Sequence, residues 1–402
     1  MNILFLHRSF PGQFRYLASA LSLDPANTVV FITEDDKNQI EGIQKFVYTT
    51  DYSNAKKCDP YLYEYEDAVI QGQAAAGVAM NLKQQGFVPD IIVGFASWGS
   101  ELFMKDIYPD VPLLTYFEWF GNPEGADVGF DGQVLTEDAR ANLRSNNFPL
   151  LASLNVCDAG MSPTHWQKKQ FPKEYQDKIK VIHDGIDVGL YVPDDNAKFI
   201  VKDKNLELTA SDEVITYGTR GMEPYRGFPE FMQAVEKLLV TRPNAHFVIA
   251  GEDNVHYGEQ LKSGTYKELM LKKLKLDMSR VHFVGTLPFA EYAKLLQVSA
   301  AHVYLTYPFV LSWSILDAMS AGCCIVASDT EPVLEVIEDN YNGLLVDFFD
   351  VNQLAKKIEY ALDNKEKMKE IRANARQAVI DKYSLEVTLP QQIQYIYSLL
   401  GV

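Results

Sequence analysis

Residues 307–329, "YPFVLSWSILDAMSAGCCIVASD", carry the pattern that decides the fold. They follow the apolar run "AHVYLTY", and either Ser312 or Ser314 can cap the helix whose body is "WSILDAM". Gly322 is the residue type that ends helices, and a second apolar run, "CCIVAS", follows at once. A strand, a helix and another strand in this order are typical of a parallel sheet with crossover helices.

The same alternation of short apolar runs and longer helical segments extends through the chain and predicts two open α/β domains. Predicted strands of the first set lie at 2–7, 28–33, 90–95, 112–117, 158–163 and 178–187, and those of the second at 212–218, 245–252, 281–285, 301–307, 323–328 and 343–348. The polar stretch 191–213 reads as an interdomain connection. We therefore expect an N-terminal domain over 1–190, a second domain over 191–378, and a C-terminal helix over 379–402 that packs back on the first domain.

The composition excludes several classes of protein. The chain has 402 residues, with 37 Lys and Arg against 54 Asp and Glu, for a net charge of -17. This acidic balance argues against nucleic-acid and anionic-lipid partners. No run of about 18 apolar residues and no secretory signal is present, so we expect a soluble cytoplasmic protein without an integral membrane segment. The four cysteines lack the spacing of zinc sites, and we expect no bound metal.

Two arginines lie in the broken stretch "TYGTRGMEPYRGF", directly after the first predicted strand of the second set. Open α/β sheets bind ligands beyond the carboxyl ends of their strands. The planar fork of arginine suits phosphate oxygens, so Arg220 and Arg226 are candidates for neutralising a diphosphate without a metal. The alternative is a solvated loop in which the two arginines offset Glu223 and Glu230.

The helix that starts near Ser312 offers a second anion site, because its free N–H groups and positive dipole end face the same edge of the sheet. Asp317, about one turn into this helix, is expected to face that edge and to accept hydrogen bonds from sugar hydroxyls. The alternative for Asp317 is an ordinary acidic residue that interacts with the helix dipole.

Taken together, these segments resemble the retaining GT-B glycosyltransferases of family 4, the glycosyl transferases group 1, over nearly the whole chain. In that family an arginine and a lysine six residues apart hold the donor diphosphate, and Arg220 and Arg226 occupy those places here. The phrase "IHDGID" resembles the family's interdomain motif, and "EVIEDNYNGLLVDF" resembles the segment beyond the donor-site helix.

The resemblance also has departures. The family's first donor-site glutamate, which touches the transferred sugar, is replaced by Phe309, and the second, which holds the ribose, is replaced by Asp317. Backbone N–H groups of Val310, Leu311 and Ser312 are still expected to serve the diphosphate, because that role needs no particular side chain.

In the first domain, Glu118 takes the place of a histidine that the family often carries on the acceptor side. It is expected to position the acceptor hydroxyl or to accept its proton; the alternative is a structural acid. His7, at the end of the first predicted strand, is a further candidate, with an ordinary strand-end histidine as its alternative. The loop "RSFPGQF" supplies Gly12, where the backbone is expected to approach the ligand.

The resemblance implies two Rossmann-like domains facing each other across a cleft. It also implies transfer of a sugar from a nucleoside diphosphate sugar to a glycan or small-molecule hydroxyl, with retention of configuration and with no metal or other cofactor. A nicotinamide-dependent oxidoreductase is disfavoured because neither first turn contains G-x-G-x-x-G. A sugar phosphorylase, an epimerase, and a catalytically altered carbohydrate-binding or scaffolding relative remain open alternatives.

Overall fold

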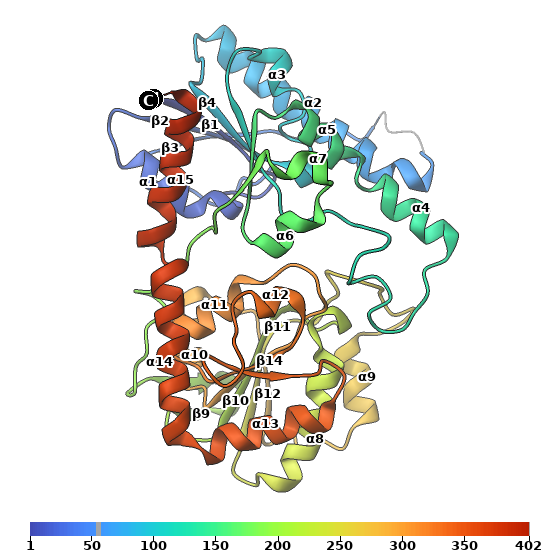
Figure 1. Cartoon of the computed structure of the whole chain (residues 1–402), viewed down its shortest axis with the longest axis vertical. Coiled ribbons are helices and arrows are strands. Elements are labelled where there is room, and N and C mark those ends of the chain that lie inside the picture. Colours follow the sequence, from blue (N-terminus) through green and yellow to red (C-terminus); the bar gives the residue numbers. More distant parts are fainter. Residues whose placement is uncertain (54–57, 402) are drawn as a thin grey trace. The chain divides into compact units, whose positions relative to one another are not determined.

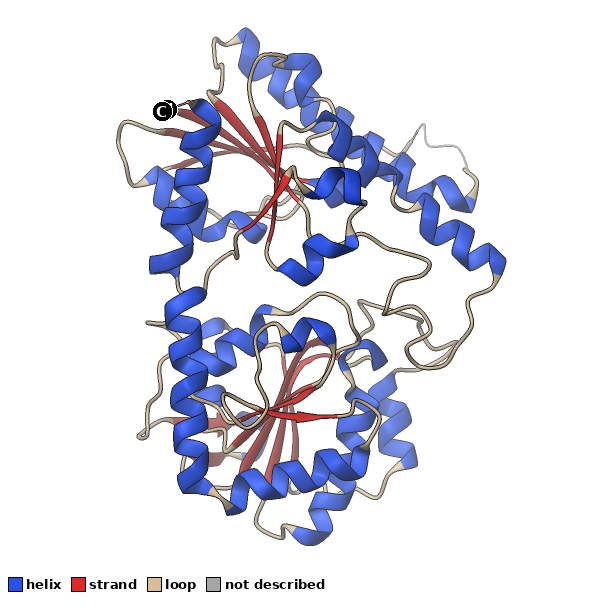
Figure 2. Ribbon diagram, viewed as in Figure 1, coloured by secondary structure: helices blue, strands red, loops and turns tan. Residues whose placement is uncertain are grey.

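The computed structural model describes residues 1–53 and 58–401 and divides into two compact units. Unit 1 comprises Met1–Gly185 together with Leu385–Val402, and unit 2 comprises Ile186–Ser384. In each unit a sheet forms the middle layer and helices cover both of its faces (Figure 2). The first part of unit 1 ends at residue 185, five residues before the expected 190. Its second part begins at residue 385, six residues after the expected 379.

The sheet of unit 1 has seven parallel strands in the order β3-β2-β1-β4-β5-β6-β7. All six strands expected in this half are present. The strand β3 was not predicted, because its sequence "IQKFV" carries polar residues and lies at the edge of the sheet. The strands are β1 (Asn2–Leu6), β2 (Thr28–Thr33), β3 (Ile43–Val47), β4 (Ile91–Phe95), β5 (Leu113–Tyr116), β6 (Ala159–Ser162) and β7 (Ile179–Val181).

Strand β1 shows why this sheet is buried on both faces. Side chains alternate across a strand, and both sets in β1 are apolar. Leu4 and Leu6 pack with the helices of one face, whereas Ile3 and Phe5 pack with those of the other. The helices of unit 1 are α1 (Arg15–Ser22), α2 (Tyr63–Gln84), α3 (Met104–Ile107), α4 (Glu137–Ser145), α5 (Phe148–Val156), α6 (His165–Gln170), α7 (Lys173–Gln176) and α15 (Leu385–Leu400), with 3-10 turns η1 (Gly12–Phe14), η2 (Pro60–Leu62) and η3 (Ala96–Trp98).

The last helix of the chain, α15, belongs to unit 1. It lies beside α1 (Figure 1), and Ile396 is fully buried in the core that α1 shares with the sheet. The helix α14 that precedes it remains in unit 2, so the chain returns to unit 1 between two consecutive helices.

The main sheet of unit 2 has six parallel strands in the order β12-β11-β10-β13-β14-β15, and the sequence pattern predicts all six. These strands are β10 (Val214–Gly221), β11 (His246–Glu252), β12 (Val281–Gly285), β13 (Ala301–Tyr304), β14 (Ile325–Ser328) and β15 (Leu344–Val346). The helices are α8 (Phe228–Thr241), α9 (Tyr266–Lys273), α10 (Phe289–Gln297), α11 (Trp313–Ser320), α12 (Glu331–Leu334), α13 (Val351–Asp363) and α14 (Lys365–Lys382), with 3-10 turns η4 (Lys202–Lys204) and η5 (Pro224–Arg226).

The stretch 191–213, expected to be an interdomain connection, instead contains an antiparallel hairpin of β8 (Lys198–Val201) and β9 (Leu206–Thr209). Phe199, Val201 and Leu208 are buried in a core shared with β10 and β11. The hairpin therefore belongs to the body of unit 2. Its polar residues point outward, which gave the stretch the appearance of a linker.

The strand order fixes where a ligand site belongs. In unit 2 the order reverses between β10 and β13, and in unit 1 it reverses between β1 and β4. Ligands of open α/β sheets bind at such a point, beyond the carboxyl ends of the strands. The loops that follow these four strands are thus the first places to look for functional residues.

No helix within residues 1–53 and 58–401 has both the length and the apolar composition that a membrane crossing requires.

Candidate functional site

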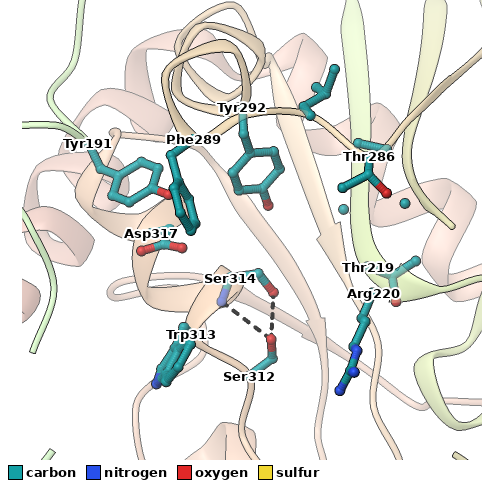
Figure 3. Close-up of a pocket in the computed structure, with 14 residues that line it drawn as sticks. Tyr191, Thr219, Arg220, Thr286, Phe289, Tyr292, Ser312, Trp313, Ser314 and Asp317 are labelled. Carbon is teal, nitrogen blue, oxygen red and sulfur yellow. Dashed lines mark hydrogen bonds between the residues drawn. The ribbon is translucent and has the colours of Figure 1, made fainter. Parts of the chain in front are cut away.

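A cavity of about 220 Å³ opens in unit 2 beyond the carboxyl ends of β10, β11 and β12 (Figure 3). Its wall is built from the last residues of β10 and β11, the loop between β12 and α10, and the starts of α10 and α11. Three of the residues expected from the sequence line it, namely Arg220, Ser312 and Asp317. The cavity lies at the reversal of strand order, where the topology places a ligand.

One end of the cavity favours an anion. Arg220 is an exposed residue near the end of β10, and its side chain lies across from the start of α11 (Figure 3). Of the two possible helix caps, Ser312 takes the role: its Oγ accepts a 3.4 Å hydrogen bond from the backbone N–H of Ser314. The guanidinium and the positive end of the helix dipole thus flank the same space.

Arg226 is placed differently from Arg220, because it is only 8% exposed and does not line the cavity. Its Nη1 donates hydrogen bonds to Thr306 Oγ1 at 2.8 Å, to the Val310 carbonyl at 3.0 Å and to Tyr304 Oη at 3.3 Å. The side chain therefore ties η5 to the loop between β13 and α11.

Phe309, which stands in place of a glutamate, helps to cover the buried arginine. Its ring centroid lies 5.9 Å from the Arg226 guanidinium carbon, and that of Tyr257 lies 5.4 Å away. Aromatic faces attract a cation at such distances, more strongly where water is excluded. The substitution at residue 309 thus contributes to the packing around Arg226 in place of a carboxylate.

The backbone groups before α11 point in several directions. The Val310 carbonyl accepts from Arg226, and the Ser312 N–H donates a 2.9 Å hydrogen bond to Tyr304 Oη. Val310 and Leu311 are buried and lie outside the cavity wall, whereas Ser312 is part of it. In this structure the three residues do not present a shared row of N–H groups to the cavity.

Asp317 lies in the body of α11, with its carboxyl group facing the cavity near Tyr191 (Figure 3). Burial raises the pKa of Asp317 well above its usual range, while a hydrogen bond from Tyr191 opposes this shift. Because burial disfavours its charged form, the carboxyl group is suited to bind neutral hydroxyl groups.

The other end of the cavity is aromatic and was not foreseen from the sequence. Tyr191, Phe289 and Tyr292 gather around Asp317 (Figure 3). Their positions follow from tertiary structure, because Tyr191 lies before the hairpin and the other two begin α10. One signal was available: Phe289 and Tyr292 come shortly after the end of β12, at the ligand-binding edge of the sheet.

In unit 1, Glu118 is linked to His7 through Gln13. Ser9 N–H donates to His7 Nδ1 at 2.9 Å, so His7 Nε2 carries the proton and donates to Gln13 Oε1 at 2.8 Å. Burial lowers the pKa of His7 to about 4, which keeps the ring neutral. With its oxygen fixed in this way, Gln13 donates from Nε2 to Glu118 Oε1 at 3.1 Å.

Gly12 leaves the space that the His7 ring needs to take part in these hydrogen bonds. Its φ is +54°, and a Cβ atom on it would come within 2.5 Å of the His7 ring. The close approach here is thus to a side chain of the same loop. Gln13 was not singled out from the sequence, although it is the immediate neighbour of Gly12.

Within the described ranges 1–53 and 58–401, no group of three or more His, Cys, Asp or Glu side chains is arranged to hold a metal ion. The four cysteines are free thiols, and three of them are buried.

Comparison with solved structures identifies the class of fold. HepE of Anabaena, solved in complex with UDP-glucose, matches with a TM-score of 0.70 and 18% identity, over 99% of each chain. Sucrose-phosphate synthase from Thermosynechococcus elongatus matches with a TM-score of 0.73 and 15% identity, over 100% of this chain and 99% of the other. The protein therefore has the GT-B fold of these glycosyltransferases.

Family models then assign the chain within that class. Residues 25–191 match the glycosyl transferase family 4 group, and residues 201–378 match the glycosyl transferases group 1. An uncharacterized glycosyltransferase of Methanocaldococcus jannaschii is 29% identical over 133 residues, which span 32% of this chain and 32% of that relative. The chain belongs to the group 1 glycosyltransferases, a family of enzymes.

Proposed function

We propose that the protein transfers a sugar from a nucleoside diphosphate sugar to an acceptor hydroxyl, with retention of configuration and without a metal ion. The observation that carries this proposal is the cavity of unit 2, where Arg220 and the start of α11 lie at one end and Asp317 at the other. That arrangement suits a ligand with an anionic part and a polyhydroxyl part. HepE, solved with UDP-glucose, shares the fold over nearly its whole length.

The chemical difficulty in such a transfer is the negative charge that builds up on the departing diphosphate. Arg220 and the dipole of α11 are fixed in place before the reaction, so they stabilise this charge without reorganising. Arg226 contributes by holding the loop that precedes α11. These permanent positive groups supply the neutralisation for which other enzymes use a divalent cation.

Glu118 is the proposed acid–base group for the acceptor, which is a glycan or another small molecule with a free hydroxyl. The hydrogen bond from Gln13 leaves the carboxylate in a defined orientation. Retention follows if the acceptor attacks from the face that the diphosphate leaves, with no nucleophile from the protein. The free thiols of all four cysteines fit a reducing compartment, and we place the reaction in the cytoplasm.

The test is a panel of nucleotide sugars, measured first by thermal stabilisation and then by turnover with candidate acceptors. A true donor stabilises the folded protein because it binds only that state. We expect one nucleotide class to raise the melting temperature and the matching nucleotide sugar to be consumed. If UDP, GDP and ADP and their sugars all leave the melting temperature unchanged, the proposal is wrong.

A further inference from the structure

The hydroxyl group of Tyr292 is buried within unit 2 and is not engaged by the protein. Tyr292 lies in the first turn of α10, and its Oη has no hydrogen-bond partner among the described residues. It rests against the backbone of β10, since a Cβ atom on Gly218 would come within 2.5 Å of it. Most buried polar groups in folded proteins are paired, so an unpaired one needs an explanation.

The ring of Tyr292 is held so that this hydroxyl points into the cavity. Its backbone N–H donates to the Pro288 carbonyl at 2.9 Å, and its ring meets that of Tyr191 edge-on at 6.4 Å. Figure 3 shows the hydroxyl directed at the space between Ser314 and Thr286. Burial, reinforced by Asp317, raises the pKa of Tyr292 well above its usual range, so the group keeps its proton and can donate.

The position along the cavity indicates which part of a ligand this hydroxyl meets. Arg220 and the start of α11 take the anionic part at one end. Tyr292 belongs to the aromatic end with Tyr191 and Phe289, which suits a flat base and its ribose. A hydroxyl there has no charge to offer a diphosphate but can pair with a nucleoside oxygen or nitrogen.

We propose that Tyr292 is a specificity-determining residue whose hydroxyl hydrogen-bonds to the nucleoside half of the donor. This inference rests on the proposed function of the cavity. It also explains why the hydroxyl has no partner in the empty protein, because its hydrogen bond forms only when the donor is bound. Stability in the empty protein is then lower than it would be with phenylalanine at this position.

The experiment uses Tyr292→Phe, which removes only the hydroxyl. The full-length wild type is first titrated by calorimetry with UDP, GDP and ADP, and the tightest of these and its monophosphate are then used. We expect the variant to bind both about tenfold more weakly, by the same factor, since one hydrogen bond to the nucleoside is lost. Arg220→Ala should weaken the diphosphate far more than the monophosphate.

The same variant is expected to melt at a temperature equal to or above that of the wild type when no ligand is present. Tyr108→Phe is the matched control in unit 1, because its buried hydroxyl donates to the Ala79 carbonyl at 3.1 Å. That control should lower the melting temperature and leave nucleotide binding unchanged.

Unchanged nucleotide affinity in Tyr292→Phe would overturn the inference, as would weaker binding of the diphosphate with unchanged binding of the monophosphate. A clear drop in the melting temperature of the empty variant would show that the hydroxyl is engaged within the protein, and would also overturn it. If the wild type binds none of the three diphosphates, the proposed function fails as well, which is a separate result.

Discussion

The guanidinium of Arg226 donates a 3.0 Å hydrogen bond to the carbonyl oxygen of Val310, which lies 84 residues further along the chain. This contact joins the turn after β10 to the loop before α11, so the two halves of the anion-binding end are positioned together. Arg226, which the sequence predicts to contact the donor, therefore also holds the two segments of the site in place.

Arg226→Ala is therefore expected to lower both stability and donor binding. The change leaves the Val310 carbonyl and the Thr306 hydroxyl without their donor, at a cost of about 1–3 kcal/mol for a buried group left unpaired. Thermal melting with and without UDP measures both effects. A variant with the wild-type melting temperature would contradict the positioning role.

Arg220→Ala, in contrast, is expected to leave the stability unchanged, because Arg220 is exposed and its loss leaves the fold intact. Loss of one preorganised cationic donor should reduce turnover by about 10²–10³-fold. The measurement is kcat and KM with the donor found in the nucleotide-sugar panel. Arg144→Ala, at an exposed arginine of α4, is the matched control and should leave both constants unchanged. Near-normal turnover in Arg220→Ala would refute the diphosphate site.

Gln13→Leu should lower kcat with little effect on donor KM, because it removes the hydrogen bond that orients Glu118 in unit 1. We expect Glu118→Gln to be more severe, with a loss of about 10²–10⁴-fold if the carboxylate acts as the acid–base group. Steady-state kinetics of both variants and of the double variant check this. If the double variant is as impaired as Glu118→Gln alone, Gln13 acts through Glu118; fully additive losses would contradict that.

The stability of the protein should fall as the pH drops from about 6.5 to about 4. Burial lowers the pKa of His302 from 6.5 to about 4, so the unfolded chain binds a proton in this window that the folded chain excludes. Between pH 7 and pH 5 this amounts to about 2 kcal/mol from His302 alone. His302→Asn should reduce the pH dependence of the melting temperature. An unchanged dependence would show that His302 titrates normally when folded.

Removal of divalent cations with EDTA should leave turnover within about twofold of the untreated enzyme. In the proposed mechanism, Arg220 and the start of α11 take the place of a metal ion at the diphosphate. Re-addition of Mg²⁺ or Mn²⁺ serves as the control. A strict requirement for either ion would contradict this part of the mechanism.

The sequence was sufficient for the fold because its strands are buried on both faces and therefore appear as unbroken apolar runs. It failed where local polarity hid strands, at β3 and at the hairpin of β8 and β9. The segment "KFIVKDKNLELT" alternates apolar and polar residues around Asn205, whose φ of 47° marks the turn of the β8–β9 hairpin. That alternation is itself a strand pattern and could have been read as a hairpin.

For the candidate site, the spacing of residues along a helix predicts where a side chain points, whereas the spacing of residues in a loop does not. The direction of the Asp317 side chain can be predicted from the number of residues between Asp317 and the cap of α11, because helix geometry determines the face on which each residue lies. The burial of Arg226 depends on contacts with Thr306 and Val310, far away in the sequence. Tyr292 reaches the same cavity from α10, and only the assembled sheet brings these elements together.

The return of α15 to unit 1 has a consequence for how the chain is made. During synthesis, all of unit 2 leaves the ribosome after residue 185 and before residue 385. Until α15 emerges, the apolar surface of α1 that buries Ile396 stays uncovered, so the first unit to be translated is the last to be completed. Chains that end before residue 385 should therefore be sensitive to proteases within residues 1–185.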